Sequence, residues 1–105
     1  MPPHPNSVQV TVGGSNGELI FNPASLTGVD VGDIVRFTLA PGAGVHSLTQ
    51  ALDANNPCEA ATNGVNHLFD PSNPSSVTFD QRVEFVAPFF AFCNVPGHCA
   101  AGMQF

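Results

Sequence analysis

Short runs in which apolar and polar residues alternate one by one constrain this chain most, because that period belongs to strands with one buried face. The runs stop at clusters rich in glycine, proline or asparagine, such as 13–17 and 41–44. Helical periodicity sustained over three turns does not occur in the sequence. We therefore predict an all-β fold, with strands at 8–12, 19–21, 34–40, 45–50, 77–79, 82–86, 89–93 and 103–105.

Seven or eight short strands separated by turn clusters indicate a β-sandwich. Residues 51–76 are rich in Asn, Pro, Ala and Ser, and we expect an irregular excursion there with at most a short helix near 59–61. The phenylalanines that we expect to build the core are Phe21, Phe37, Phe79, Phe85, Phe90 and Phe92.

The length of 105 residues predicts one domain over 1–105, with 1–6 as a flexible proline-rich terminus. Eight acidic residues against two arginines and no lysine give a net charge of −6, which disfavours nucleic acid and anionic lipid as partners. No stretch reaches the roughly 18 consecutive apolar residues of a membrane span. No leader with a basic and then an apolar region precedes the strands, which fits a mature domain from which a signal peptide has been removed.

Cys93, His98 and Met103 place a thiol, an imidazole and a thioether in one short segment with Cys-x4-His-x4-Met spacing. Thiolate and thioether are soft ligands that favour copper over calcium, magnesium or manganese. A second imidazole would complete a trigonal site with a weak axial thioether. His46 is the best candidate, because it lies in a predicted strand whose side-chain directions are set by the pleat. The odd cysteine count leaves one sulfur outside any intramolecular pair.

At these residues the chain resembles the cupredoxin family of small blue-copper electron-transfer proteins. The segments that carry the resemblance are GDIVRF at 32–37, VHSLTQ at 45–50, PC at 57–58 and FCNVPGHCAAGM at 92–103. They are most similar to the phytocyanin-like branch, and especially to fungal extracellular cupredoxins. The sequence differs from the usual family pattern in having no tryptophan or tyrosine.

The resemblance implies a Greek-key β-sandwich with one type 1 copper ion at one end. It implies that His46, Cys93 and His98 bind the copper, that Met103 is its axial ligand, and that Cys58 and Cys99 form a disulfide. Such a disulfide implies an oxidising, extracellular compartment. The implied function is the transfer of single electrons by a monomer that is not an enzyme.

Hydrogen bonds to a copper-bound sulfur tune its potential. We expect Ser47, together with a backbone N–H from 94–97, to donate them to Cys93. His98 lies among small and apolar residues, so we expect it to be the electron port at which a redox protein docks.

Other interpretations of the same residues stay open. Structural zinc would need a fourth strong donor from Cys58, Cys99 or His67, in place of a thioether. Copper capture or delivery without redox turnover would use the same ligands as electron transfer. Catalysis is disfavoured because four protein ligands leave no open position for a substrate. His4 and His67 are simplest as solvated side chains.

Overall fold

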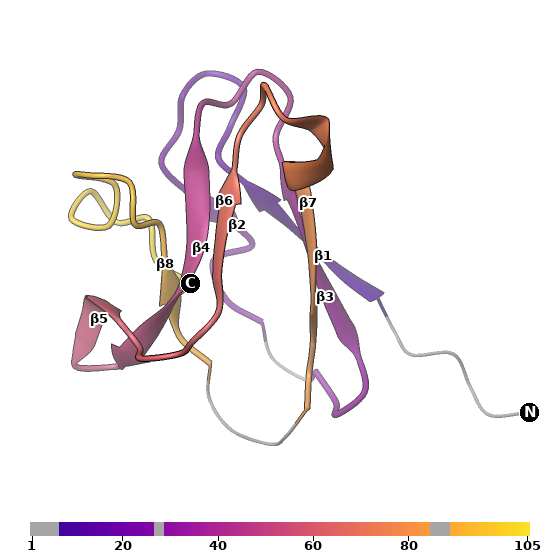
Figure 1. Cartoon of the computed structure of the whole chain (residues 1–105), viewed down its shortest axis with the longest axis vertical. Coiled ribbons are helices and arrows are strands. Elements are labelled where there is room, and N and C mark those ends of the chain that lie inside the picture. The colour runs from indigo at the N-terminus through magenta and orange to yellow at the C-terminus, as the bar shows by residue number, and fades with distance from the viewer. Residues whose placement is uncertain (1–6, 27–28, 85–88) are drawn as a thin grey trace, which may run out of the picture.

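The computed structural model describes residues 7–26, 29–84 and 89–105, which form two facing sheets around one core (Figure 1). The described residues contain eight strands, and their one helical element is a 3-10 turn, η1, at Pro74–Ser76. The predicted all-β sandwich is therefore confirmed. None of the helical structure in the described ranges is long and apolar enough to span a membrane. Residues 1–6, including His4, lie outside the described part.

The first sheet has the order β2-β1-β3-β7. Its strands are β1 (Ser7–Val12), β2 (Phe21–Asn22), β3 (Ile34–Leu39) and β7 (Thr78–Arg82). β1 runs parallel to β3, whereas β2 pairs antiparallel with β1 and β7 antiparallel with β3. The alternation read from the sequence is real here, because in β3 Val35, Phe37 and Leu39 are buried while Arg36 is exposed.

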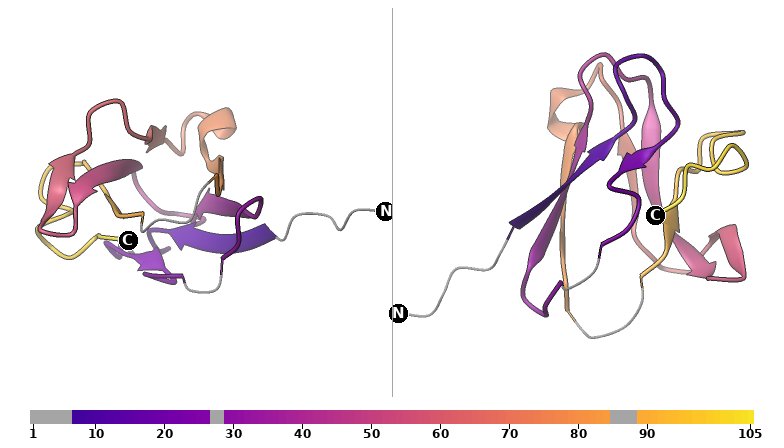
Figure 2. Two further views of the ribbon diagram at one scale, coloured as in Figure 1. Left: turned by 90° about the horizontal axis from the view of Figure 1, so that it is seen from below. Right: turned by 180° about the vertical axis from the view of Figure 1, so that it is seen from behind.

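The second sheet is organised around β4 (His46–Asp53), which pairs antiparallel with all three of its neighbours. These neighbours are β5 (Asn56–Ala60), β6 (Asn66–Phe69) and β8 (Ala91–Phe92). Figure 2 shows the same arrangement from below and from behind, with the segment that follows β8 (yellow) beside β4 and β5. The chain thus visits the second sheet for β4 to β6, returns to the first for β7, and ends in the second.

The core lies between the sheets and is built from both of them. Phe105 closes one side of it, edge-on to Phe37 and Phe21 with ring centroids 5.4 and 6.0 Å away. The other principal members are Val10, Val12, Val35, Leu39, Leu48, Phe69, Cys93 and Met103.

The expectation of an irregular excursion over 51–76 with a helix near 59–61 is wrong. β4 extends to Asp53, and the region then contains β5, β6 and η1. Four of the five residues of β5 are exposed, so this edge strand shows no apolar alternation. The Asp53 carboxylate accepts hydrogen bonds from the amides of Asn55 and Asn56, both at 2.9 Å, and so shapes the turn into β5.

Strand boundaries near the end of the chain also differ from the predicted ones. One strand, β7, replaces those expected at 77–79 and 82–86, although 85–86 lie outside the described residues. β8 is shorter than 89–93. At 103–105 there is a single bridge between Phe92 and Gln104, flanked by paired backbone bonds between Ala91 and Phe105.

The predicted phenylalanine core is correct in part. Phe21, Phe37 and Phe92 are buried, and Phe79 is partly buried against the core. Phe90 is 39% exposed and lies just before the short strand β8. Phe69 is fully buried although its segment showed no strand pattern, and Phe85 lies outside the described residues.

Replacing Leu48 with Ala should test the central place of β4 in the core. Leu48 is fully buried, so Leu48→Ala should lower the free energy of unfolding by about 2–5 kcal/mol. Leu68 on the adjacent β6 is 54% exposed, and Leu68→Ala should change it by no more than about 0.5 kcal/mol. Urea denaturation measures both, and equal losses for the two variants would contradict this account of the core.

Candidate metal centre

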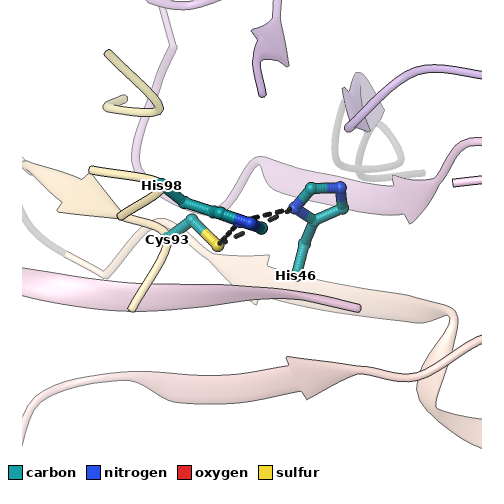
Figure 3. A group of neighbouring side chains, drawn as sticks. All are labelled: His46, Cys93 and His98. Carbon is teal, nitrogen blue, oxygen red and sulfur yellow. Dashed lines mark hydrogen bonds between the residues drawn. The ribbon is translucent and has the colours of Figure 1, made fainter. Parts of the chain in front are cut away.

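Side chains from two distant parts of the sequence converge at one end of the second sheet: His46 from one part, and Cys93 and His98 from the other (Figure 3). The Nδ1 atoms of the two histidines are 3.3 Å apart. Cys93 Sγ lies 3.2 Å from His98 Nδ1 and 3.8 Å from His46 Nδ1. The three atoms therefore form a small triangle of two nitrogens and one sulfur.

Strand pairing brings His46 and Cys93 together. His46 is the first residue of β4, and Cys93 directly follows β8. The two strands pair antiparallel, with Thr49 opposite Phe92. In an antiparallel pair, residues before Thr49 on β4 lie opposite residues after Phe92. The start of β4 therefore lies beside the end of β8.

The ligand segment, residues 93–103, turns back on itself to add His98 and Met103. Met103 N–H donates to the His98 carbonyl at 3.0 Å, and Cys93 N–H donates to the Met103 carbonyl at 3.1 Å. Gly97 and Gly102 have φ of +83° and +105°, a left-handed conformation that other residues rarely adopt. The Met103 side chain is fully buried in the same cluster as Cys93.

The exposure of the site is one-sided. Cys93 and His46 are 0% and 2% exposed, whereas His98 is only half-buried. Burial, and to a smaller extent the nearby His98, lowers the pKa of His46 below its ordinary value. His46 therefore keeps its neutral, metal-binding form at a lower pH than an ordinary histidine does.

Because the pKa of His46 is lower in the folded than in the unfolded chain, the metal-free protein should lose stability as pH falls below about 6.5.

The triangle has the size that one metal ion needs. Bonds of about 2.0 Å to nitrogen and about 2.3 Å to sulfur in a trigonal plane separate two nitrogens by about 3.5 Å and a nitrogen from sulfur by about 3.7 Å. The three observed separations, 3.3, 3.2 and 3.8 Å, lie close to these values. Both imidazoles present the same type of atom, Nδ1, to the centre.

Ser47 contacts Cys93 through its main chain. The Ser47 amide N–H points at Cys93 Sγ with a distance of 3.3 Å. The Asn94 amide donates to Ser47 Oγ at 2.7 Å, and not to the sulfur as we expected for a backbone N–H from 94–97. The Ser47 hydroxyl takes this bond because it lies beside the peptide that follows Cys93.

Comparisons with known proteins define the fold of the chain. No protein-family model and no curated protein matches the sequence. Among the solved structures that match are a mutant fern plastocyanin determined in oxidized and reduced forms and oxidized plastocyanin from Dryopteris crassirhizoma, each with a TM-score of 0.67 at 24% identity. Each of these two matches covers 92% of this chain and 94% of the other. The chain has the cupredoxin fold.

Within this cupredoxin fold, the remaining two cysteines lie next to the site. The sulfur atoms of Cys58 on β5 and Cys99 are within bonding distance of each other, and Cys93 is the free cysteine. Cys99 packs with Ala51 and Phe92 on the outer face of the second sheet. Since Cys99 follows His98, this pair ties the ligand segment to β5.

His67 does not contribute to the triangle of His46, Cys93 and His98. Its Nε2 lies 2.8 Å from the Ser76 carbonyl, and its ring lies against Phe69 and Phe79. Our expectation that it is solvated is wrong in this respect, because the ring is half-buried and holds η1 against β6.

Gly13 is a residue of the site that the sequence did not single out. A Cβ built on Gly13 would lie 2.6 Å from His46 Nε2, so the missing side chain leaves room for the back of the imidazole. In the sequence Gly13 belongs to an ordinary turn cluster, and no signal there distinguishes it from its neighbours.

Gly13→Ala should therefore displace His46 and weaken metal binding by at least about tenfold. Gly17→Ala is a matched control, because Gly13 and Gly17 have similar φ of +71° and +83°, yet nothing lies within 4 Å of a Cβ at Gly17. Both variants should lose similar stability from backbone strain. Competition with a chelator measures affinity, and equal weakening by both variants would contradict a contact between position 13 and His46.

Proposed function

We propose that this protein is a type 1 copper protein that carries single electrons. The main support for this proposal is the triangle formed by His46 Nδ1, Cys93 Sγ and His98 Nδ1. Two imidazoles and a thiolate in a trigonal arrangement, with a methionine close by, are the donor set of blue-copper sites. A structural neighbour solved in both oxidized and reduced forms adds support for a redox role.

The donor chemistry favours copper over zinc. A structural zinc site needs four strong nitrogen or sulfur donors. In the described residues, the sulfurs of Cys58 and Cys99 lie against each other, and His67 contacts Ser76. Met103 is then the remaining candidate for the fourth position, and a thioether suits copper.

Copper supplies the chemistry of gaining and losing one electron when it is bound. The protein holds its ligands in place between the geometries that the two oxidation states prefer. His46 is fixed by β4 and by its packing against Gly13, and the ligand segment is closed by the backbone bonds of Met103. The Ser47 N–H stabilises negative charge on Cys93 Sγ. Small rearrangement of the ligands permits fast transfer.

Burial favours electron transfer over delivery of copper or catalysis. A protein that hands over its metal must expose ligands for exchange with an acceptor, but Cys93 and His46 are 0% and 2% exposed. Four protein donors also leave no open coordination position for a substrate. An electron, unlike a metal ion or a substrate, can pass through a half-buried imidazole.

His98 is the proposed electron port. It is half-buried and surrounded by exposed residues that are small or apolar: Pro96, Gly97, Ala100, Ala101 and Gly102. Such a surface lets a partner approach the imidazole edge closely. The net charge of −6 would attract a basic redox protein, with a salt-dependent association rate.

We further propose that the protein works outside the cytosol as a monomer. A bond between Cys58 and Cys99 needs an oxidising compartment. The whole proposed ligand set comes from one chain, so the site does not require a second copy. We also propose that the protein belongs to the phytocyanin-like branch of the cupredoxins.

Loading the protein with Cu(II) tests the proposed function. The wild type should show an intense visible thiolate-to-copper absorption, and Cys93→Ser should abolish it because the oxygen replaces the proposed thiolate ligand. The Cys58→Ser, Cys99→Ser double variant controls for cysteine loss as such and should keep the band. A colourless wild type that binds zinc in preference to copper would disprove the assignment.

Substitutions at Met103 test its role as the axial ligand. Met103→Gln should lower the reduction potential, because an amide oxygen stabilises Cu(II) more than a thioether does. Met103→Leu removes the donor and should raise the potential. Voltammetry measures both, and an unchanged potential in the two variants would exclude Met103 from coordination.

A further inference from the structure

A chain of buried hydroxyl groups runs from the ligand segment across the outer face of the second sheet. Ser47 Oγ, which accepts from Asn94 N–H, lies 3.0 Å from Thr49 Oγ1. Thr49 Oγ1 donates in turn to Asn66 Oδ1 at 3.0 Å. We call Ser47, Thr49 and Asn66 the hydroxyl relay. Ser47 and Thr49 are 4% and 2% exposed, and Asn66 lies at the exposed end.

The direction of every hydrogen bond in the relay is determined by its ends. The Asn94 amide can only donate, so Ser47 Oγ accepts there. The Thr49 proton goes to Asn66, so Ser47 must donate its own proton to Thr49. All the donors therefore point away from the ligand segment, and bonds aligned in this way strengthen one another.

Thr49 is the central member because of its place in the sheet. In the strand register it lies opposite Asn66 on β6 and opposite Phe92 on β8. Cys93 and Asn94 follow Phe92 directly. The relay thus connects β6 and β4 to the peptide bond that joins Cys93 to Asn94.

We propose that Thr49 and Asn66 are positioning residues that hold Cys93 through Ser47, an inference that rests on the proposed copper function. They fix the rotamer of Ser47, whose hydroxyl anchors the Asn94 amide while its own amide points at Cys93 Sγ. Without the Thr49 hydroxyl, the Ser47 hydroxyl loses the acceptor of its proton among the residues that the structure describes. The Cys93–Asn94 peptide then loses its fixed anchor, and the thiolate gains freedom to move.

Thr49→Val tests this inference, because it removes the hydroxyl and keeps the shape of the side chain. In metal-free protein, the Asn94 amide should exchange with deuterium at least about tenfold faster than in the wild type. In copper-loaded protein, electron self-exchange should slow by about tenfold. The surface met by the second molecule is unchanged, since Thr49 is 2% exposed. Thr49→Ser restores the hydroxyl and should restore both rates.

Thr38→Val is the matched control, because Thr38 lies half-buried on β3 of the first sheet. It should leave both rates near those of the wild type. Asn66→Ala removes the final acceptor at an exposed position and should also speed Asn94 exchange, whereas Asn66→Asp keeps an acceptor oxygen and should not. This pair decides the question if Thr49→Val fails to fold.

The inference is overturned if Asn94 exchange in Thr49→Val or Asn66→Ala stays at the wild-type rate, or if Thr38→Val speeds it equally. Unchanged electron self-exchange in a copper-loaded variant with faster amide exchange would overturn the link from the relay to the thiolate. The amide measurement needs no metal. Absence of the blue absorption from the wild type would therefore reject the copper function, while amide exchange still decides whether the relay holds the peptide.

Discussion

The antiparallel pairing of β4 with β8 is the interaction on which the rest of the site depends. Only two pairs of residues are in register, yet they set the start of β4 beside the end of β8. His46 and Cys93, 47 positions apart in sequence, are thereby held close together, one at the start of β4 and the other directly after β8. The remaining histidine and Met103 are then added by a short segment that is closed by local backbone bonds and tied to β5 through Cys99 and Cys58. One long-range strand pairing and one short turn thus bring the proposed ligands together.

The two faces of β4 have different tasks. Its inner face carries His46 and Leu48, which belong to the site and to the core. Its outer face would meet water in a simple two-layer sandwich, but Ser47, Thr49 and Ala51 are buried there. The ligand segment covers this face, with Cys99 and Phe92 packed against Ala51. Polar groups are used on this second buried face because the peptides of the ligand segment need hydrogen-bond partners.

The sequence was most informative where chemistry and periodicity coincide. Alternation predicted β1 and β3 well, and donor types at fixed spacing predicted the convergence of Cys93 and His98 with His46. It was least informative for β5, an exposed edge strand held by main-chain bonds, and for Phe90, which lies just outside the short strand β8. Gly13 and Thr49 could not be singled out, because their roles come from neighbours that are adjacent only in the folded chain.

The uneven burial of the three donors also affects how a bound metal would be released. His46 belongs to the central strand of its sheet, whereas His98 is half-buried in a segment held by a few backbone bonds and by the link from Cys99 to Cys58. Segments of that kind open by sub-global fluctuations that cost much less free energy than complete unfolding. Loss of metal should then follow the opening of residues 94–104, at a rate separate from the lifetime of the sandwich. The rate of metal loss and the rate of global unfolding would accordingly differ, while bound metal still stabilises the fold by mass action.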